Sequence, residues 1–258
     1  MATVTPGMPC WVDLASPDVE AARRFYGELF GWTSQVAPEP EAAGYTTFRK
    51  GDKAVAAVGP LMDQGRQPAW TTYFATGDAE ATAARVEGIW GKVVMWPTDV
   101  LGYGRMALFR DTTGAPFGVW QPGSMSGEEI SGAPGSRTWS ELMTRNPEGA
   151  KEFYADVLGW RSRGSRYDAS NYTIFEIGDT VTAGMMPMDG DGWPADMPPH
   201  WAVYFEVEDV DATAATAKRL GGSVSVPPTD SPAGRFAVLA DPHGASFSVI
   251  TSNPEYRP

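Results

Sequence analysis

The stretch Phe25-Tyr-Gly-Glu-Leu-Phe-Gly-Trp32 decides the fold, because it returns 128 residues later as Phe153-Tyr-Ala-Asp-Val-Leu-Gly-Trp160. The match extends along the chain with offsets that drift only between 127 and 131 residues. The paired positions include Trp11 with Trp139, Tyr45 with Tyr172, Trp70 with Trp201, and Asp111 with Asp241. Short loop insertions produce such a drift, so the sequence predicts two copies of one domain.

The two copies divide the 258-residue chain into parts of ordinary domain size, which is roughly 100–150 residues. We expect the first domain at residues 7–122 and the second at residues 136–252. Residues 123–135 mix Gly, Ser and Pro and show little hydrophobic periodicity, which is typical of a linker.

Composition and charge restrict the function classes. The chain has 42% hydrophobic residues and a net charge of −12, so it should fold and should repel the phosphates of nucleic acids. No apolar run approaches the roughly 20 residues that cross a bilayer, and the N-terminus lacks the features of a signal peptide. We therefore expect a cytoplasmic protein that binds neither nucleic acid nor membrane. The single Cys10 excludes an internal disulfide and a multi-cysteine metal site.

The first half of each copy alternates strand and helix signals. Residues 11–14 predict a strand, and Ser16-Pro-Asp18 is a helix-start sequence. Apolar positions then recur at helical spacing from Val19 until Gly31, which supplies the stop. Two further strands are expected at residues 45–48 and 54–58.

The second half of each copy repeats this order. Residues 70–75 predict a strand and the Ala-rich residues 79–88 a helix, with strands near 93–95, 105–109 and 116–120. Each copy is therefore two βαβββ units of the α+β class. Two such units place curved antiparallel sheets face to face, and their concave sides should enclose a pocket for a small ligand.

These motifs resemble the vicinal oxygen chelate superfamily, which includes glyoxalase I, extradiol dioxygenases, and fosfomycin- and bleomycin-resistance proteins. The resemblance rests on the repeated octapeptide, on Glu206-Val-Glu-Asp-Val-Asp211 before an Ala-rich helix, and on the turn Asp241-Pro-His-Gly244. It covers both halves and implies two tandem domains of this superfamily. The chain is similar to tandem actinobacterial proteins labelled glyoxalase/bleomycin-resistance proteins or hydroxylases. Because one fold hosts several chemistries, the resemblance leaves the activity open.

The resemblance also implies where metal ligands would lie, namely on the first strand, on the strand that opens the next unit, and on the last strand. Those positions fall on Trp11, Thr71 and Gly118 in the first copy, and on Trp139, Ala202 and Ser248 in the second. Indole nitrogen is a donor only, and the chain has just two His, both in the second copy. We therefore expect no metal ion and no other cofactor.

Side chains alternate along a strand, so residues two positions apart share a face. The expected ligand-binding residues on the concave face are Trp11, Trp139, Tyr73, Tyr204, Thr71 and His200. Asp13 and Glu141 should lie beside these aromatic walls, where desolvation raises the pKa of a carboxyl group. They are the candidate catalytic residues and could also anchor a cationic ligand. The alternative is a structural carboxylate, paired with a neighbouring strand or with Arg105 and Arg235.

Three functions remain open. The leading hypothesis is a metal-independent binding protein that holds a planar metabolite or antibiotic in aromatic-lined cavities, with a role in resistance or secondary metabolism. The first alternative is a cofactor-free hydroxylase, isomerase or lyase that acts on a polyketide or keto compound. The second is a metal-dependent glyoxalase or dioxygenase with displaced ligands drawn from Asp13, Glu141 and His200. The partner is a small molecule in each case, and the chain could be a monomer or a homodimer.

Overall fold

The structure is a computed structural model that describes residues 4–63, 65–165, 171–190 and 192–257. The elements of the N-terminal copy are β1 (Pro9–Ser16), α1 (Val19–Phe30), β2 (Thr33–Val36), a 3-10 turn (Pro40–Ala42), β3 (Thr46–Lys50), β4 (Lys53–Pro60), β5 (Ala69–Ala75), α2 (Ala79–Gly88), β6 (Lys92–Asp99), β7 (Gly104–Arg110) and β8 (Pro116–Pro122). Those of the C-terminal copy are β9 (Arg137–Thr144), α3 (Pro147–Leu158), β10 (Arg161–Gly164), β11 (Thr173–Ile177), β12 (Thr180–Pro187), β13 (His200–Glu206), α4 (Val210–Arg219), β14 (Ser223–Ser231), β15 (Gly234–Ala240) and β16 (Ser246–Ser252).

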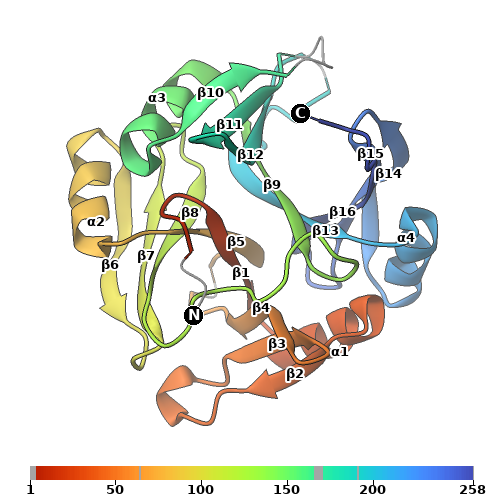
Figure 1. The fold of residues 1–258 in the computed structure, drawn as a ribbon. Helices are drawn as coiled ribbons and strands as arrows, with labels where there is room; N and C mark the ends of the chain where they lie inside the picture. The colour runs from red at the N-terminus through yellow and green to blue at the C-terminus, as the bar shows by residue number, and fades with distance from the viewer. Residues whose placement is uncertain (1–3, 64, 166–170, 191, 258) are drawn as a thin grey trace.

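Each copy forms one curved mixed sheet of eight strands (Figure 1). The strand order is β2-β3-β4-β1-β5-β8-β7-β6 in the N-terminal copy and β10-β11-β12-β9-β13-β16-β15-β14 in the C-terminal copy. These orders are equivalent, so the predicted duplication and the two βαβββ units per copy are confirmed. Among the described residues, no helix combines the length and apolar character needed to cross a membrane.

Local signals set the helix limits. The Asp18 side chain accepts a hydrogen bond from Ala21 N at the start of α1, and Gly31 ends that helix with a φ of 69°. In the same way, Asn146 caps the start of α3 and Gly159 ends that helix. The sequence did not predict β2 and β10, because these four-residue edge strands are mostly exposed and carry no alternating apolar pattern.

The two halves of each sheet meet through one antiparallel strand pair. In the N-terminal copy, Trp11 lies opposite Tyr73 and Asp13 opposite Thr71. Residues directly opposite on paired strands share a face, so all four point to one side of the sheet. The C-terminal copy repeats this arrangement, with Trp139 opposite Tyr204 and Glu141 opposite Ala202. This side is the concave face.

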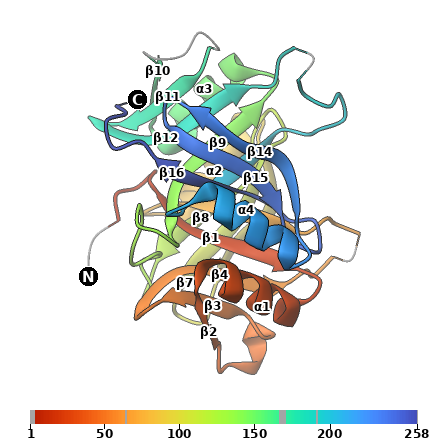
Figure 2. The ribbon, with the colours of Figure 1, turned by 90° about the vertical axis from the view of Figure 1, so that its right-hand side faces the viewer.

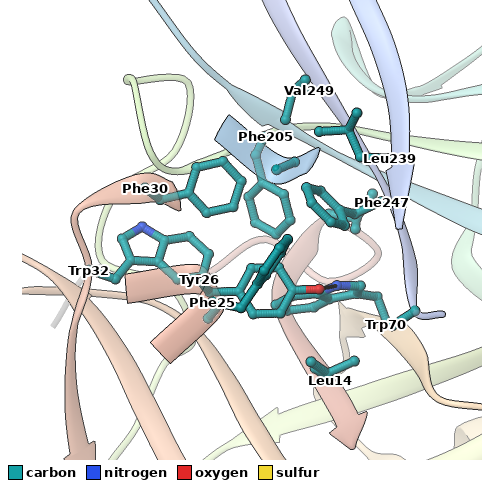
Figure 3. Close-up of a cluster of buried hydrophobic side chains, with 14 of the residues drawn as sticks. Leu14, Phe25, Tyr26, Phe30, Trp32, Trp70, Phe205, Leu239, Phe247 and Val249 are labelled. Atoms are coloured by element: carbon teal, nitrogen blue, oxygen red, sulfur yellow. Dashed lines mark hydrogen bonds between the residues drawn. The ribbon is translucent and has the colours of Figure 1, made fainter. Parts of the chain in front are cut away.

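The convex faces pack into hydrophobic clusters that both copies build together. One cluster joins α1, β1 and β4 to α4, β13, β15 and β16, and the other joins α2, β7 and β8 to α3, β11 and β12. Accordingly α1 lies beside α4, and α2 beside α3 (Figures 1 and 2). In the first cluster, Tyr26 is fully buried against Trp70 and Phe247 (Figure 3). Each sheet is thus continuous in sequence, whereas each cluster is shared between the copies.

The segment predicted as a linker is tied to the N-terminal copy. Glu128 N donates to Cys10 O over 2.7 Å, and the Glu129 carboxylate accepts from Ala54 N over 2.6 Å. The buried carboxylate of Glu128 also pairs with the guanidinium of Arg137, at the start of β9. These contacts hold the segment against the N-terminal copy and connect it to the start of β9.

Candidate functional site

Four side chains form a hydrogen-bonded group on the concave face of the C-terminal sheet. Tyr204 Oη donates to Glu141 Oε2 over 2.8 Å, and Tyr172 also hydrogen-bonds to Glu141. Trp139 Nε1 donates to Tyr172 Oη over 3.0 Å. We call these residues the C-terminal tetrad. They come from β9, from β13 and from the residue just before β11, so the sheet itself fixes their positions.

A cavity of about 350 Å³ opens beside the C-terminal tetrad, and all four tetrad residues line it. Its other walls include Ile174, Met186, Phe236, Ile250 and Tyr256. This volume lies near the lower end of the range for small-molecule sites, roughly 300–1,000 Å³. The described part of its wall is therefore mostly apolar and aromatic, with Glu141 as its one carboxylate.

The electrostatics keep the two phenols of the C-terminal tetrad protonated. Burial and the nearby Glu141 carboxylate both raise the pKa of Tyr172 and of Tyr204 well above the usual value for tyrosine. Neutral phenols act as donors to Glu141, which explains how a carboxylate with an exposed fraction of only 6% is accommodated here.

The N-terminal copy contains the matching group, which we call the N-terminal tetrad. Tyr45 Oη and Tyr73 Oη each donate to Asp13 Oδ2 over 3.2 Å, and Trp11 Nε1 donates to Tyr45 Oη over 3.0 Å. Burial raises the pKa of Asp13 to about 7, against the lowering effect of the two phenol hydrogen bonds. Here the indole of Trp120 packs into one cluster with Trp11 and Tyr73.

The structure brings most of the predicted site residues together. Trp11, Asp13 and Tyr73 meet in the N-terminal tetrad, and Trp139, Glu141 and Tyr204 meet in the C-terminal tetrad. Thr71 lies opposite Asp13 on the same face. His200 lies opposite Met143, outside the cavity wall, with Nδ1 2.9 Å from Pro198 O. Burial lowers the pKa of His200.

The structure adds two tyrosines to the predicted site and gives its carboxylates other partners than arginine. Tyr45 and Tyr172 were missed as site residues, although their match in the repeat was a usable signal. The proposed pairing of the buried carboxylates with Arg105 and Arg235 is wrong. Arg105 pairs with Glu80, and Arg235 pairs with Asp211 and Asp230. The partners are phenols instead, and Tyr73 and Tyr204 lie on the neighbouring strands, which was the other part of that alternative.

The residues present do not fit a divalent metal ion at the positions that the resemblance implies. Trp11, Thr71 and Gly118 supply no carboxylate or imidazole, and neither do Trp139, Ala202 and Ser248. The displaced ligands are not gathered either, because Asp13 belongs to the other sheet from Glu141 and His200. In the described part of the chain, no group of three or more His, Cys, Asp or Glu is placed to hold a metal.

Comparisons with known proteins agree with this fold. The family model described as Glyoxalase/Bleomycin resistance protein/Dioxygenase superfamily matches residues 10–119 and 138–249. The chain is 47% identical over 270 residues to the anthracycline biosynthesis protein DnrV of Streptomyces peucetius, covering 99% of this chain and 97% of the relative. It is 46% identical, with the same coverage, to the anthracycline biosynthesis protein DauV of Streptomyces sp. (strain C5).

Among solved structures, the 2,3-dioxygenase LapB from Pseudomonas sp. KL28 matches with a TM-score of 0.66 and 16% identity. The match covers 100% of this chain and 97% of that chain. At this identity the likeness shows the fold alone.

Proposed function

Because the chain belongs to the Glyoxalase/Bleomycin resistance protein/Dioxygenase superfamily, we propose that it is a binding protein that encloses a planar small molecule without a metal ion. The observation that carries this proposal is the cavity beside the C-terminal tetrad, with indole and phenol rings in its wall. Offset stacking of a flat ligand on such rings contributes about 0.5–1.5 kcal/mol per contact beyond the area buried.

The relatives suggest the ligand class. DnrV and DauV are both named for anthracycline biosynthesis. Anthracyclines are fused-ring aromatic polyketides. The indole and phenol rings that line the C-terminal cavity can stack on a planar aromatic polyketide. Glu141 adds one polar contact, because a carboxylate offers about four acceptor positions for donors such as a ligand hydroxyl. We therefore propose a role in secondary metabolism, as a binder of an aromatic polyketide.

The side chains available as metal ligands support the proposal that the ligand is bound without a metal ion. A divalent ion of the Zn, Ni or Fe(II) kind takes two or three nitrogen or sulfur ligands in most proteins. Among the residues that the structure describes, the C-terminal cavity wall offers one carboxylate and no imidazole.

A cofactor-free enzyme is the second candidate, and one observation favours it. Glu141 is buried in the cavity wall beside two protonated phenols, where it could take a proton from a ligand carbon next to a ketone. Tyr204 or Tyr172 could then donate a hydrogen bond to the enolate oxygen that forms.

Tryptophan-fluorescence titration with an anthracycline aglycone, combined with mass spectrometry of the recovered ligand, separates these functions. The binding proposal predicts quenching with unchanged ligand, and metal analysis below one ion per ten chains. Converted ligand would favour the enzyme, and loss of that conversion in Glu141→Gln with quenching retained would identify Glu141 as its base. Failure of every planar ligand to quench, or stoichiometric metal in the purified protein, would overturn the proposal.

A further inference from the structure

The two tetrads are equivalent, but the strand beside each carries a different side chain at one position. Trp120 on β8 lies opposite Met106, two residues beyond Gly118, which lies beside Tyr73. Ile250 on β16 lies opposite Phe236, two residues beyond Ser248, which lies beside Tyr204. Trp120 and Ile250 therefore occupy equivalent positions on the concave faces of the two sheets.

The indole of Trp120 fills space inside the N-terminal copy. Its exposed fraction is 5%, it packs with Trp11 and Tyr73, and its Nε1 donates to Met125 O over 2.9 Å. Gly104 makes room for the ring, because a Cβ atom there would collide with the Trp120 indole. Trp11 beside it is correspondingly only 2% exposed.

The same region of the C-terminal copy is open. Ile250 and Phe236 line the cavity, and so does Ala233, which precedes Gly234, the counterpart of Gly104. Tyr256 contributes to the wall from the segment after β16, whereas Met125 packs against Trp120 and its neighbours from the segment after β8. The C-terminal cavity thus includes the place that an indole takes up in the other copy.

We infer that Trp120 is a built-in occupant of the N-terminal site, and that the C-terminal site takes a flat fused-ring ligand in the corresponding place, one molecule per chain. This inference rests on the proposed function and specifies it. The ligand ring lies across β15 and β16 next to Ile250, with one edge toward Tyr204 and Glu141. This place can hold at least a bicyclic ring, because the Trp120 indole fits the equivalent volume of the N-terminal copy.

Exchange of the two residues tests the inference in the full chain. Ile250→Trp places an indole in the C-terminal cavity, with Gly234 available to accommodate it as Gly104 does for Trp120. Trp120→Ala removes the indole from the N-terminal copy. Ser225→Trp is the matched control, because it adds an indole at an exposed position of β14. Calorimetric titrations with two probes, an anthracycline aglycone and free indole, give affinity and stoichiometry.

We expect one aglycone per chain in the wild type, at least a fifty-fold weaker Kd in Ile250→Trp, and an unchanged Kd in Ser225→Trp. The Trp120→Ala variant should gain a second site, which binds free indole. This result tests the inference even if the Ile250→Trp variant does not fold. Two sites in the wild type, or tight binding by a folded Ile250→Trp variant, would overturn the inference and leave the proposed function standing. A wild type that binds neither probe would instead overturn the proposed function. In that case, uptake of indole by Trp120→Ala would still support the inference that Trp120 fills the N-terminal site.

Discussion

Tyr26 donates a hydrogen bond from its phenol to Asp241 Oδ2 over 3.2 Å, and thereby joins a helix of the first copy to a turn of the second. The other oxygen of Asp241 accepts from Ala245 N, so one carboxylate closes its own turn and receives the partner helix. The equivalent contact runs from the second copy to the first, where Tyr154 Oη donates to Asp111 Oδ2 over 3.0 Å. The repeated Phe-Tyr motif is therefore an element of the interface between the copies.

Removal of either phenol should weaken that interface. We expect Tyr26→Phe and Tyr154→Phe each to lower the free energy of unfolding by about 1–3 kcal/mol, because a buried carboxylate oxygen loses its donor. The two sites lie in different clusters, so the double variant should show nearly additive losses. Urea unfolding measures this, with Tyr103→Phe at an exposed tyrosine as control. Losses no larger than that of the control would refute the role of these contacts.

The free energy of unfolding should depend on pH because the Asp13 carboxyl group titrates differently in the folded and unfolded chain. Burial raises the pKa of Asp13 from 3.8 in the unfolded chain to about 7 in the folded protein, so folding favours the protonated form. Its contribution is therefore complete below about pH 4 and is lost as the pH rises to about 7. Between pH 5 and pH 8, the wild type should lose about 2 kcal/mol relative to Asp13→Asn. This window covers about two of the roughly three pKa units of the shift, each about 1.4 kcal/mol, and the partial exposure of Asp13 reduces the loss further. Parallel pH profiles of wild type and variant would contradict this assignment.

Tyr204→Phe should weaken ligand binding as well as stability. The change removes the 2.8 Å donor to Glu141 and leaves a buried carboxylate with one partner fewer. We expect a loss of about 1–3 kcal/mol in the free energy of unfolding and a roughly tenfold weaker Kd for a planar ligand. Chemical denaturation and fluorescence titration measure the two effects, again against Tyr103→Phe. Full affinity in a folded Tyr204→Phe variant would show that the C-terminal tetrad does not shape the site.

Gly184 on β12 lies opposite Glu141, and the absence of a side chain there makes room for the C-terminal tetrad. A Cβ atom at this position would collide with the Tyr172 hydroxyl and approach Trp139 Nε1 to 3.0 Å. We expect Gly184→Ala to displace Tyr172 and to weaken planar-ligand binding at least fivefold. Gly192→Ala is the matched control, since nothing lies within 4 Å of the added atom. Equal affinities of the two variants would argue against a fixed position for Tyr172.

Much of the fold could be predicted from the sequence because the signals are local. Strand alternation placed Trp11 with Asp13 and Trp139 with Glu141 on one face, and the helix limits at Val19 and Gly31 followed from capping residues. The phenols around each carboxylate were partly predictable, since Tyr73 and Tyr204 lie on the expected strands.

Contacts between distant segments were not predictable. The apolar face of α1 could pack within its own copy or against the other one, and the sequence pattern is the same in both cases. The filling of the N-terminal site by Trp120 also escaped prediction, because it depends on where the indole ring lies and not on the hydrophobic pattern of β8. The contacts that Glu128 and Glu129 of the linker make with the N-terminal copy and with Arg137 were not predictable either, because they join residues far apart in the sequence and leave no hydrophobic periodicity.

A crystal structure of the protein with a bound anthracycline aglycone tests the central claim most directly. We predict one ligand per chain in the C-terminal cavity, with its ring system against Ile250 and Phe236 and one polar edge toward Glu141. Ligand density in the N-terminal copy beside Trp120, or a metal ion coordinated by protein side chains in the C-terminal cavity, would contradict the account.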